Sequence, residues 1–150
     1  MQILMIVGSE MGSAEMVGDL VKDELEDSGH EVELVVDGEL DDIGLGDHEV
    51  LLVVTSTTGL GEVPQNIEPI YEGLVEDRPD LSHLRYGVIG MGDRNYKDTF
   101  CGGPRRFDAV LNELGATRVG DPLELDATDQ PMPDEDAVAW LPSWLARFED

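Results

Sequence analysis

A segment near the start of the chain has the residue types and the position of a phosphate-binding turn. Residues 8–15 contain two glycines and two serines, and they separate the apolar run 3–7 from apolar residues at helical spacing. A turn from a buried strand into a helix leaves backbone N–H groups at the helix start, where the helix dipole also favours an anion. The segment lacks the lysine of a P-loop, so dipoles and hydroxyl groups would hold the phosphate. An ordinary capped turn is the alternative.

Two further segments combine glycine with polar residues, and each follows an apolar run. Residues 55–62 read Thr-Ser-Thr-Thr-Gly-Leu-Gly-Glu after the run 50–54, and residues 90–103 begin Gly-Met-Gly-Asp-Arg-Asn-Tyr after the predicted strand 85–89. The carboxyl ends of parallel strands lie at one edge of a sheet, and ligands bind there at the point where the strand order reverses. We therefore expect the three segments to meet around one phosphate-containing ligand.

The elements that must position these segments alternate between strand and helix. Strands are predicted at 3–7, 30–36, 50–54, 85–89 and 118–125, with helical patterns between them. This pattern is typical of an α/β fold, a doubly wound, five-stranded parallel sheet with the order 2-1-3-4-5. In that order the three polar segments share one edge, whereas the acidic loop 37–47 lies to the side. Residues 1–150 would form one domain.

Glycine and proline indicate where the elements end. We expect helices to end at glycine and to begin at or after proline, at the positions Gly29, Gly115, Pro64 and Pro104. Gly120 and Pro122 are expected to interrupt the fifth strand, and Pro142 is expected to kink or restart the last helix.

The composition limits the partners and the location of the protein. The chain has 34 acidic and 9 basic residues, a formal net charge of -25, which argues against nucleic acid and anionic membranes as partners. It contains no run of about 18 apolar residues and no visible signal sequence, so we expect a soluble, cytoplasmic protein. Three explanations of the acidity stay open: docking on a basic partner, solubility, and adaptation to high salt.

Metal and disulfide chemistry are not expected. Cys101 is the one cysteine of the chain, which excludes an internal disulfide and an iron–sulfur cluster held by this chain alone. His30, His48 and His83 are scattered along the sequence and lie near no cysteine. We expect these histidines on the surface, without a metal ion.

The three polar segments together resemble the cofactor loops of the flavodoxin family, and more closely those of the FMN domains in the sulfite reductase and cytochrome P450 reductase group. The first loop of that group reads Gly-Ser-x-Thr-Gly-Thr-Ala-Glu, similar to residues 8–15. The second reads Gly-x-Gly-Asp/Glu before Pro and Asn, like residues 59–66, and the third reads Gly-x-Gly-Asp-x-x-Tyr before Phe-Cys, like residues 90–101. The resemblance covers essentially the whole chain.

Among single-domain members, the short-chain MioC-type flavodoxins are the most similar. The acidic tail of that type, with two tryptophans, matches the tail that contains Trp140 and Trp144. Because these two residues are four positions apart on a predicted helix, we expect them to pack in the core rather than to form a docking patch.

The resemblance implies FMN as the cofactor, bound by residues of all three loops. The phosphate would be held by Ser9, Glu10, Met11, Gly12, Ser13 and Ala14. The flavin ring would lie among Thr57, Thr58, Gly59, Leu60, Gly61, Gly92, Asp93, Asn95, Tyr96, Phe100 and Cys101. Neither a catalytic residue nor a metal ligand is implied.

Particular roles follow for a few of these positions. Tyr96 resembles the aromatic residue that stacks on the outer face of the flavin, and a loop anchor bonded through its hydroxyl is the alternative. Gly59 resembles the glycine whose carbonyl turns toward flavin N5, a peptide flip that needs access to positive φ. Cys101 is expected to be a small buried residue rather than a redox thiol. Thr58 replaces a common aromatic residue of the pattern, and Met11 replaces a threonine.

The function implied by the resemblance is that of a single-domain, low-potential one-electron carrier. Such a protein takes electrons from a separate NADPH-dependent flavodoxin reductase and passes them to an acceptor enzyme with a basic docking face, for which biotin synthase is one candidate. Acidic surroundings favour a low potential because they oppose negative charge on the reduced flavin. Two alternatives share the fold: an FMN-dependent quinone reductase and a flavin-free interaction module.

Overall fold

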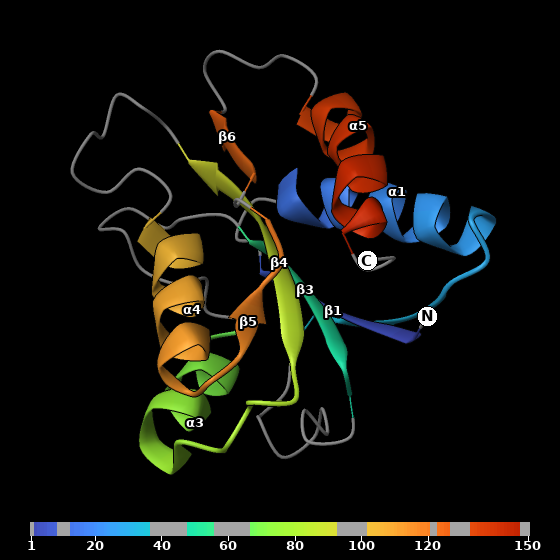
Figure 1. Cartoon of the computed structure of the whole chain (residues 1–150). Helices are drawn as coiled ribbons and strands as arrows, with labels where there is room; N and C mark the ends of the chain where they lie inside the picture. Colours follow the sequence, from blue (N-terminus) through green and yellow to red (C-terminus); the bar gives the residue numbers. More distant parts are fainter. Residues whose placement is uncertain are drawn as a thin grey trace.

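A parallel β-sheet runs through the middle of the molecule, and helices cover both of its faces (Figure 1). The computed structural model describes residues 2–8, 13–36, 48–55, 67–92, 102–120, 123–126 and 133–147. Within these residues the sheet consists of β1 (Gln2–Gly8), β2 (Glu31–Val35), β3 (Val50–Thr55), β4 (Arg85–Gly92), β5 (Thr117–Arg118) and β6 (Leu123–Asp126). Their pairings are parallel throughout.

The strand order is β2-β1-β3-β4-β5, with β6 paired to β4. β5 pairs with the start of β4 and β6 pairs with its end, where Ile89 lies opposite Leu123. These two short strands share one position beside β4, so the sheet has five strand positions in the predicted order. Gly120, with a φ of 76°, lies between them and confirms the predicted interruption, whereas Pro122 lies outside the described residues.

Continuous apolar sequences explain why the two central strands, β1 and β3, are buried on both faces. The runs Ile-Leu-Met-Ile-Val in β1 and Val-Leu-Leu-Val-Val in β3 are buried at every position. A strand whose two faces are both covered needs apolar side chains at consecutive positions, so its sequence does not alternate. By contrast, β2 lies at the edge of the described sheet, and its residues Glu31 and Glu33 are exposed.

The helices form one pair on each face of the sheet. α1 (Ser13–Asp27) packs with α5 (Pro133–Ala146) on one face, and α3 (Glu68–Asp77) packs with α4 (Gly102–Glu113) on the other (Figure 1). Each pair encloses its own apolar core against the sheet. Leu4 and Ile6 of β1 belong to the core under α3 and α4, whereas Ile3 and Met5 belong to the core under α1 and α5. This division follows from the alternation of side chains along a strand.

Two helices begin elsewhere than the prolines predicted. α3 begins at Glu68 rather than at Pro64, and Pro69 lies in its first turn. α4 begins at Gly102, so that Pro104 lies within the helix instead of before it. Pro69 and Pro104 both lie in first turns, where the missing N–H of proline is not needed.

The remaining predicted boundaries differ from the structure at β4 and α5 and agree with it after α1 and α4. β4 continues beyond the predicted strand 85–89 to Gly92, because β6 pairs with its last residues. α5 runs through Pro142 as one helix, so the predicted restart does not occur there. The positive φ values of Gly29 (92°) and Gly115 (99°), just after α1 and α4, confirm the predicted helix ends.

The two tryptophans of α5 pack against the sheet. Trp144 is 1% exposed, and Trp140 is partly buried beside the same core. Their rings are stacked, with centroids 5.6 Å apart and planes inclined by 16°. The predicted core role of this pair is confirmed.

Candidate cofactor site

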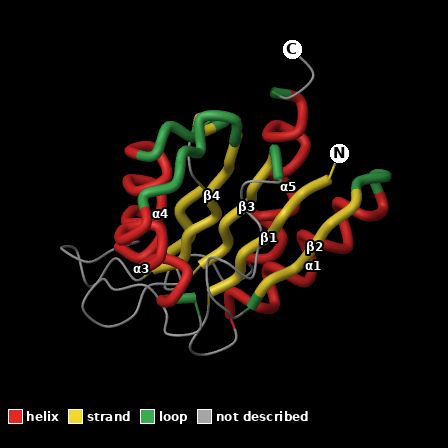
Figure 2. The backbone as a smooth tube through the Cα atoms, turned by 90° about the horizontal axis from the view of Figure 1, so that it is seen from below, coloured by secondary structure: helices red, strands yellow, loops and turns green. Residues whose placement is uncertain are grey.

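The ends of three strands meet at one edge of the sheet. Strand pairing places Gly8 of β1 beside Thr55 of β3, and Thr55 beside Gly90 of β4. Each of these residues lies at or near the point where the chain leaves the sheet for one of the polar segments. Figure 2 shows the three strands side by side. The fold therefore brings together the starts of the three predicted cofactor loops.

The first helix begins at the same edge. β1 ends at Gly8 and α1 begins at Ser13, followed by Ala14. The first N–H groups of an α-helix have no acceptor within the helix, so they are available to an anion at the favourable end of the dipole. Close packing holds α1 on the sheet, because a Cβ atom at Gly18 would lie 2.8 Å from Cγ2 of Val7.

Tight packing lies directly beneath this edge. A Cβ atom at Gly8 would lie 2.6 Å from Oγ1 of Thr55 and would overlap Cδ1 of Ile67. Thr55 and Ile67 are both 0% exposed, and Ile67 is the N-cap residue of α3. Position 8 therefore has no room for a side chain. Thr55 was predicted to lie in the second polar segment but not to support the end of β1, a role that the sequence does not indicate.

The predicted cofactor residues divide into two groups. Ser13 and Ala14 lie in the first turn of α1, and Gly92 is the last residue of β4, opposite Asp126 of β6. The remaining predicted residues lie outside the described residues: Ser9, Glu10, Met11, Gly12, Thr57, Thr58, Gly59, Leu60, Gly61, Asp93, Asn95, Tyr96, Phe100 and Cys101. The predicted fifth strand, 118–125, already placed most of β6 at this edge, and the structure extends it to Asp126.

A polar cluster anchors α4, the helix that follows the third polar segment. The Tyr86 hydroxyl donates to the Asp108 carboxylate and, at 3.1 Å, to the Asp108 backbone carbonyl. Arg118 Nη1 lies 2.5 Å from Oδ2 of the same aspartate. Burial, and then the hydrogen bond and charge of Asp108, raise the pKa of Tyr86, so that the phenol stays protonated. The cluster joins β4, α4 and β5.

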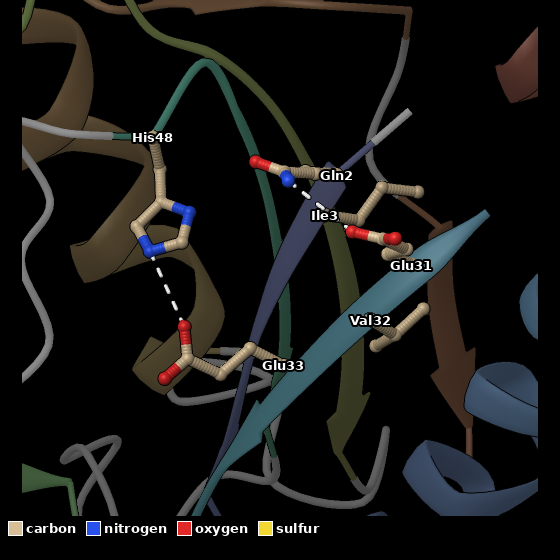
Figure 3. A pocket seen from close by; sticks show the side chains of 6 residues that line it. All are labelled: Gln2, Ile3, Glu31, Val32, Glu33 and His48. Atoms are coloured by element: carbon tan, nitrogen blue, oxygen red, sulfur yellow. Dashed lines mark hydrogen bonds and ion pairs between the residues drawn. The ribbon is translucent and has the colours of Figure 1, made fainter.

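A separate pocket of about 270 Å³ lies near the amino ends of β1 and β2 (Figure 3). Its lining consists of Gln2, Ile3, Glu31, Val32, Glu33 and His48. His48 Nε2 lies 3.3 Å from Oε2 of Glu33, and Gln2 Nε2 donates to Oε2 of Glu31 at 3.2 Å. Because this pocket lies away from the carboxyl ends of the strands, it is not the edge where the three polar segments begin.

The three histidines have different environments. His83 is exposed, as predicted. His48 is partly buried, with its side chain 19% exposed beside Glu33. His30 is half-buried, and burial together with the chain's amino terminus lowers its pKa.

The grouping of side chains and the character of the helices bear on metal and membrane binding in the described residues. In this part of the chain, no three His, Cys, Asp or Glu side chains are grouped so that they could hold a metal ion. Among the same residues, no helix combines the length and apolar character of a membrane span.

The fold and the site define a class of protein. A doubly wound parallel sheet that gathers three strand ends and a helix start at its switch point is the architecture of mononucleotide-binding α/β proteins. Residues 5–140 match the family described as flavodoxin. The chain belongs to the flavodoxin family, which confirms the resemblance found in the three loops.

Individual relatives support this assignment. Protein MioC of Escherichia coli (strain K12) is 39% identical over 143 residues, which cover 95% of each chain. The solved structure of a cysteine-to-alanine mutant of flavodoxin from Pseudomonas aeruginosa is 37% identical, covers 100% of both chains and has a TM-score of 0.91. A Fusobacterium nucleatum flavodoxin bound to flavin mononucleotide is 17% identical with a TM-score of 0.73, covers 95% of both chains and shares the fold.

Proposed function

We propose that this chain is an FMN-binding flavodoxin that carries low-potential electrons one at a time. The observation that carries the proposal is the meeting of the β1, β3 and β4 ends with the start of α1, each beside a loop of flavodoxin-like sequence. When bound, FMN supplies the one-electron chemistry, and the protein supplies binding, orientation and electrostatics.

The residues at this edge fit a phosphate-bearing flavin. The N–H groups at Ser13 and Ala14 can donate to phosphate oxygens, and segment 8–15 contains no basic side chain that would otherwise balance the phosphate charge. Gly8 fits because its missing side chain lets the end of β1 lie against Thr55 and Ile67. Loop residues 57–61 and 92–101 would then flank the ring, as the family resemblance implies.

The charge of the protein supports a low potential. An electron added to the flavin brings negative charge into the field of a chain with a formal net charge of -25. That field disfavours the reduced, anionic form and therefore lowers the potential.

Electron exchange requires partners, for which we propose a separate NADPH-dependent flavodoxin reductase and an acceptor enzyme with a basic docking face. The supporting observation is the acidic surface, which complements a basic face and speeds encounter at low salt. Biotin synthase is one candidate acceptor. Because NADPH is a cytoplasmic reductant, we propose a cytoplasmic location.

The first experiment compares FMN with riboflavin, which lacks the phosphate. The purified chain is titrated with each flavin, and quenching of flavin fluorescence gives the dissociation constants. FMN is expected to bind at least about tenfold more tightly, the equivalent of one charge-assisted hydrogen bond. A chain that binds neither flavin would refute the proposal, and equal affinities would refute the phosphate site at α1.

A matched pair of serine variants tests the start of α1. Ser13→Ala removes a hydroxyl at the first residue of the helix, whereas Ser28→Ala removes one just beyond its other end. We expect Ser13→Ala to weaken FMN binding several-fold without affecting riboflavin, and Ser28→Ala to change neither. Equal effects on both flavins would assign Ser13 to the fold rather than to the phosphate.

A third experiment separates the carrier from an enzyme of the same fold. Anaerobic reductive titration followed by absorbance counts the electron steps, and two resolved one-electron steps are expected. Rapid oxidation of NADPH by the FMN-loaded chain with a quinone, in the absence of a reductase, would instead favour the quinone reductase.

A further inference from the structure

Exposed carboxylates cover two opposite faces of the molecule. On one face α1 exposes Asp19, Asp23, Glu24, Glu26 and Asp27. On the other face α3 exposes Glu72, Glu76 and Asp77 (Figure 1). A single docked partner cannot cover both helices, since the sheet lies between them. Docking of one partner on one face therefore leaves the acidity of the other face unexplained.

Acidic residues also lie at the carboxyl ends of several helices, where the helix dipole disfavours negative charge. The last turn of α1, α3, α4 and α5 contains no basic residue. Instead, α1 ends with Glu26 and Asp27, α3 ends with Glu76 and Asp77, and α4 ends with Glu113. The carboxyl end of a helix carries the negative end of its dipole, so a carboxylate there is unfavourable, and salt screens this effect.

The basic residues supply little compensation. Lys22 lies 3.2 Å from Glu26, and Arg78, which caps α3, lies 3.8 Å from Glu113. Lys22 neutralises one carboxylate within α1, and Arg78 neutralises the last residue of α4, so each of these cations pairs with one carboxylate among several nearby. The chain has 9 basic residues against 34 acidic ones, so basic side chains are too few to pair with most of its carboxylates.

Like charges also recur along one side of α3. Glu68, Glu72 and Glu76 follow one another at spacings of four residues, which places them on the same side of the helix. A hydrogen bond with Glu68, and then the charges of Glu68 and Glu76, raise the pKa of Glu72. These three glutamates therefore repel one another at neutral pH.

We propose that the fold depends on screening salt, with dissolved cations supplying the positive charge that the helix ends and the acidic faces lack. The screening length falls from about 10 Å at 0.1 M salt to about 3 Å at 1 M. Repulsion between exposed carboxylates is therefore weakened over that range, while the apolar cores on both faces are unaffected by screening. This inference concerns the chain itself and holds with or without a bound flavin.

Thermal unfolding in potassium chloride tests the proposal. The full chain is melted at pH 7, with and without saturating FMN, in salt from about 0.05 M to about 2 M. We expect the melting temperature of the flavin-free chain to rise by about 5–10 °C, the sum of several like-charge and helix-end contributions. A melting temperature that stays constant or falls over this range would overturn the proposal, whatever the chain does with FMN.

Two Glu→Gln variants distinguish the effect of a charge at a helix end from the effect of net charge. Glu76→Gln removes one charge in the last turn of α3, and Glu49→Gln removes one exposed charge just before β3, outside the described helices. In low salt Glu76→Gln is expected to raise the melting temperature by about 1–2 °C more than Glu49→Gln. That difference should vanish at 2 M salt. Equal shifts, or a difference that persists at high salt, would overturn the role of the helix ends.

Discussion

Replacing Gly87 by alanine tests how closely α5 packs on the sheet. A Cβ atom at Gly87 would lie 2.5 Å from Nε1 of Trp144 and 2.7 Å from its Cε2. The indole cannot easily move aside, because Trp144 is 1% exposed and its ring is stacked on Trp140. The φ of Gly87 lies outside the left-handed range, so the backbone itself accepts alanine. The predicted cost is therefore one of overpacking alone.

The magnitude follows from two opposing contributions. Overpacking a filled core costs about 1–3 kcal/mol, while replacing glycine by alanine returns about 0.4–1 kcal/mol through the unfolded chain. We expect a net loss of about 1–2 kcal/mol, or about 2–8 °C in melting temperature for a domain of this size. Urea unfolding followed by far-ultraviolet circular dichroism gives the free energy directly.

A double-mutant cycle assigns this loss to its cause. Trp144→Phe removes the indole nitrogen and the ring atoms that the new methyl group would meet. In that background Gly87→Ala should cost at least about 1 kcal/mol less than in the parent protein, because residues in contact are not additive. An unchanged cost in both backgrounds, or no cost in either, would refute the packing argument.

The remaining predictions concern other contacts. Tyr86→Phe should lower the free energy of unfolding by about 1–3 kcal/mol, since it removes a donor to the charged Asp108. Because the pKa of Tyr86 is raised in the folded protein, the parent protein should lose stability above about pH 10. Urea titrations across that pH range should show a smaller loss in the variant. Lys22→Gln should cost under about 0.5 kcal/mol in low salt and nothing measurable in 1 M salt, because its ion pair is exposed. Gly8→Ala should weaken FMN binding more than tenfold in fluorescence titrations, since position 8 has no space. Gly29→Ala is its control: with φ at 92° and nothing within 4 Å, it should cost about 1 kcal/mol of stability and leave FMN affinity unchanged.

Sheet order and core composition were predictable because they depend on local patterns. The apolar runs 3–7 and 50–54 can be buried only if both faces of the sheet are covered, and this requirement places β1 and β3 at its centre. The strand–helix alternation then leaves few possible topologies. The order β2-β1-β3-β4-β5 confirms that reasoning.

Contacts between distant segments were not predictable. The neighbouring strand was predicted at 118–125, but how far β4 extends was not: β4 reaches Gly92 because β6 pairs with its last residues. The cluster of Tyr86, Asp108 and Arg118 joins three elements, and its members look like ordinary helix and strand residues in the sequence. The close approach of Gly87 to Trp144 was not predictable either, because a glycine in a strand does not indicate which side chain will pack against it.

For the candidate site, the sequence indicated the chemistry of the ligand but not the residues that pack beneath the loops. Glycine and hydroxyl residues after three strands indicated a phosphate-bearing ligand, and the strand order brings those strand ends together. Sequence reasoning did not identify Thr55 and Ile67, which pack under Gly8. Their role depends on the tertiary position of α3, which the local pattern does not specify.

The exposed carboxylates of α1 and α3 would oppose an anion at the proposed site, and distance limits their effect. Exposed carboxylates on α1 and α3 repel a phosphate through solvent, where the interaction is weak and is screened within about 10 Å at 0.1 M salt. The N–H groups at the start of α1 act at hydrogen-bond distance, where screening has little effect. The acidic end of α1 lies at Glu26 and Asp27, a full helix length away from Ser13. The same helix can therefore hold an anion at its amino end while its carboxyl end depends on salt for neutralisation.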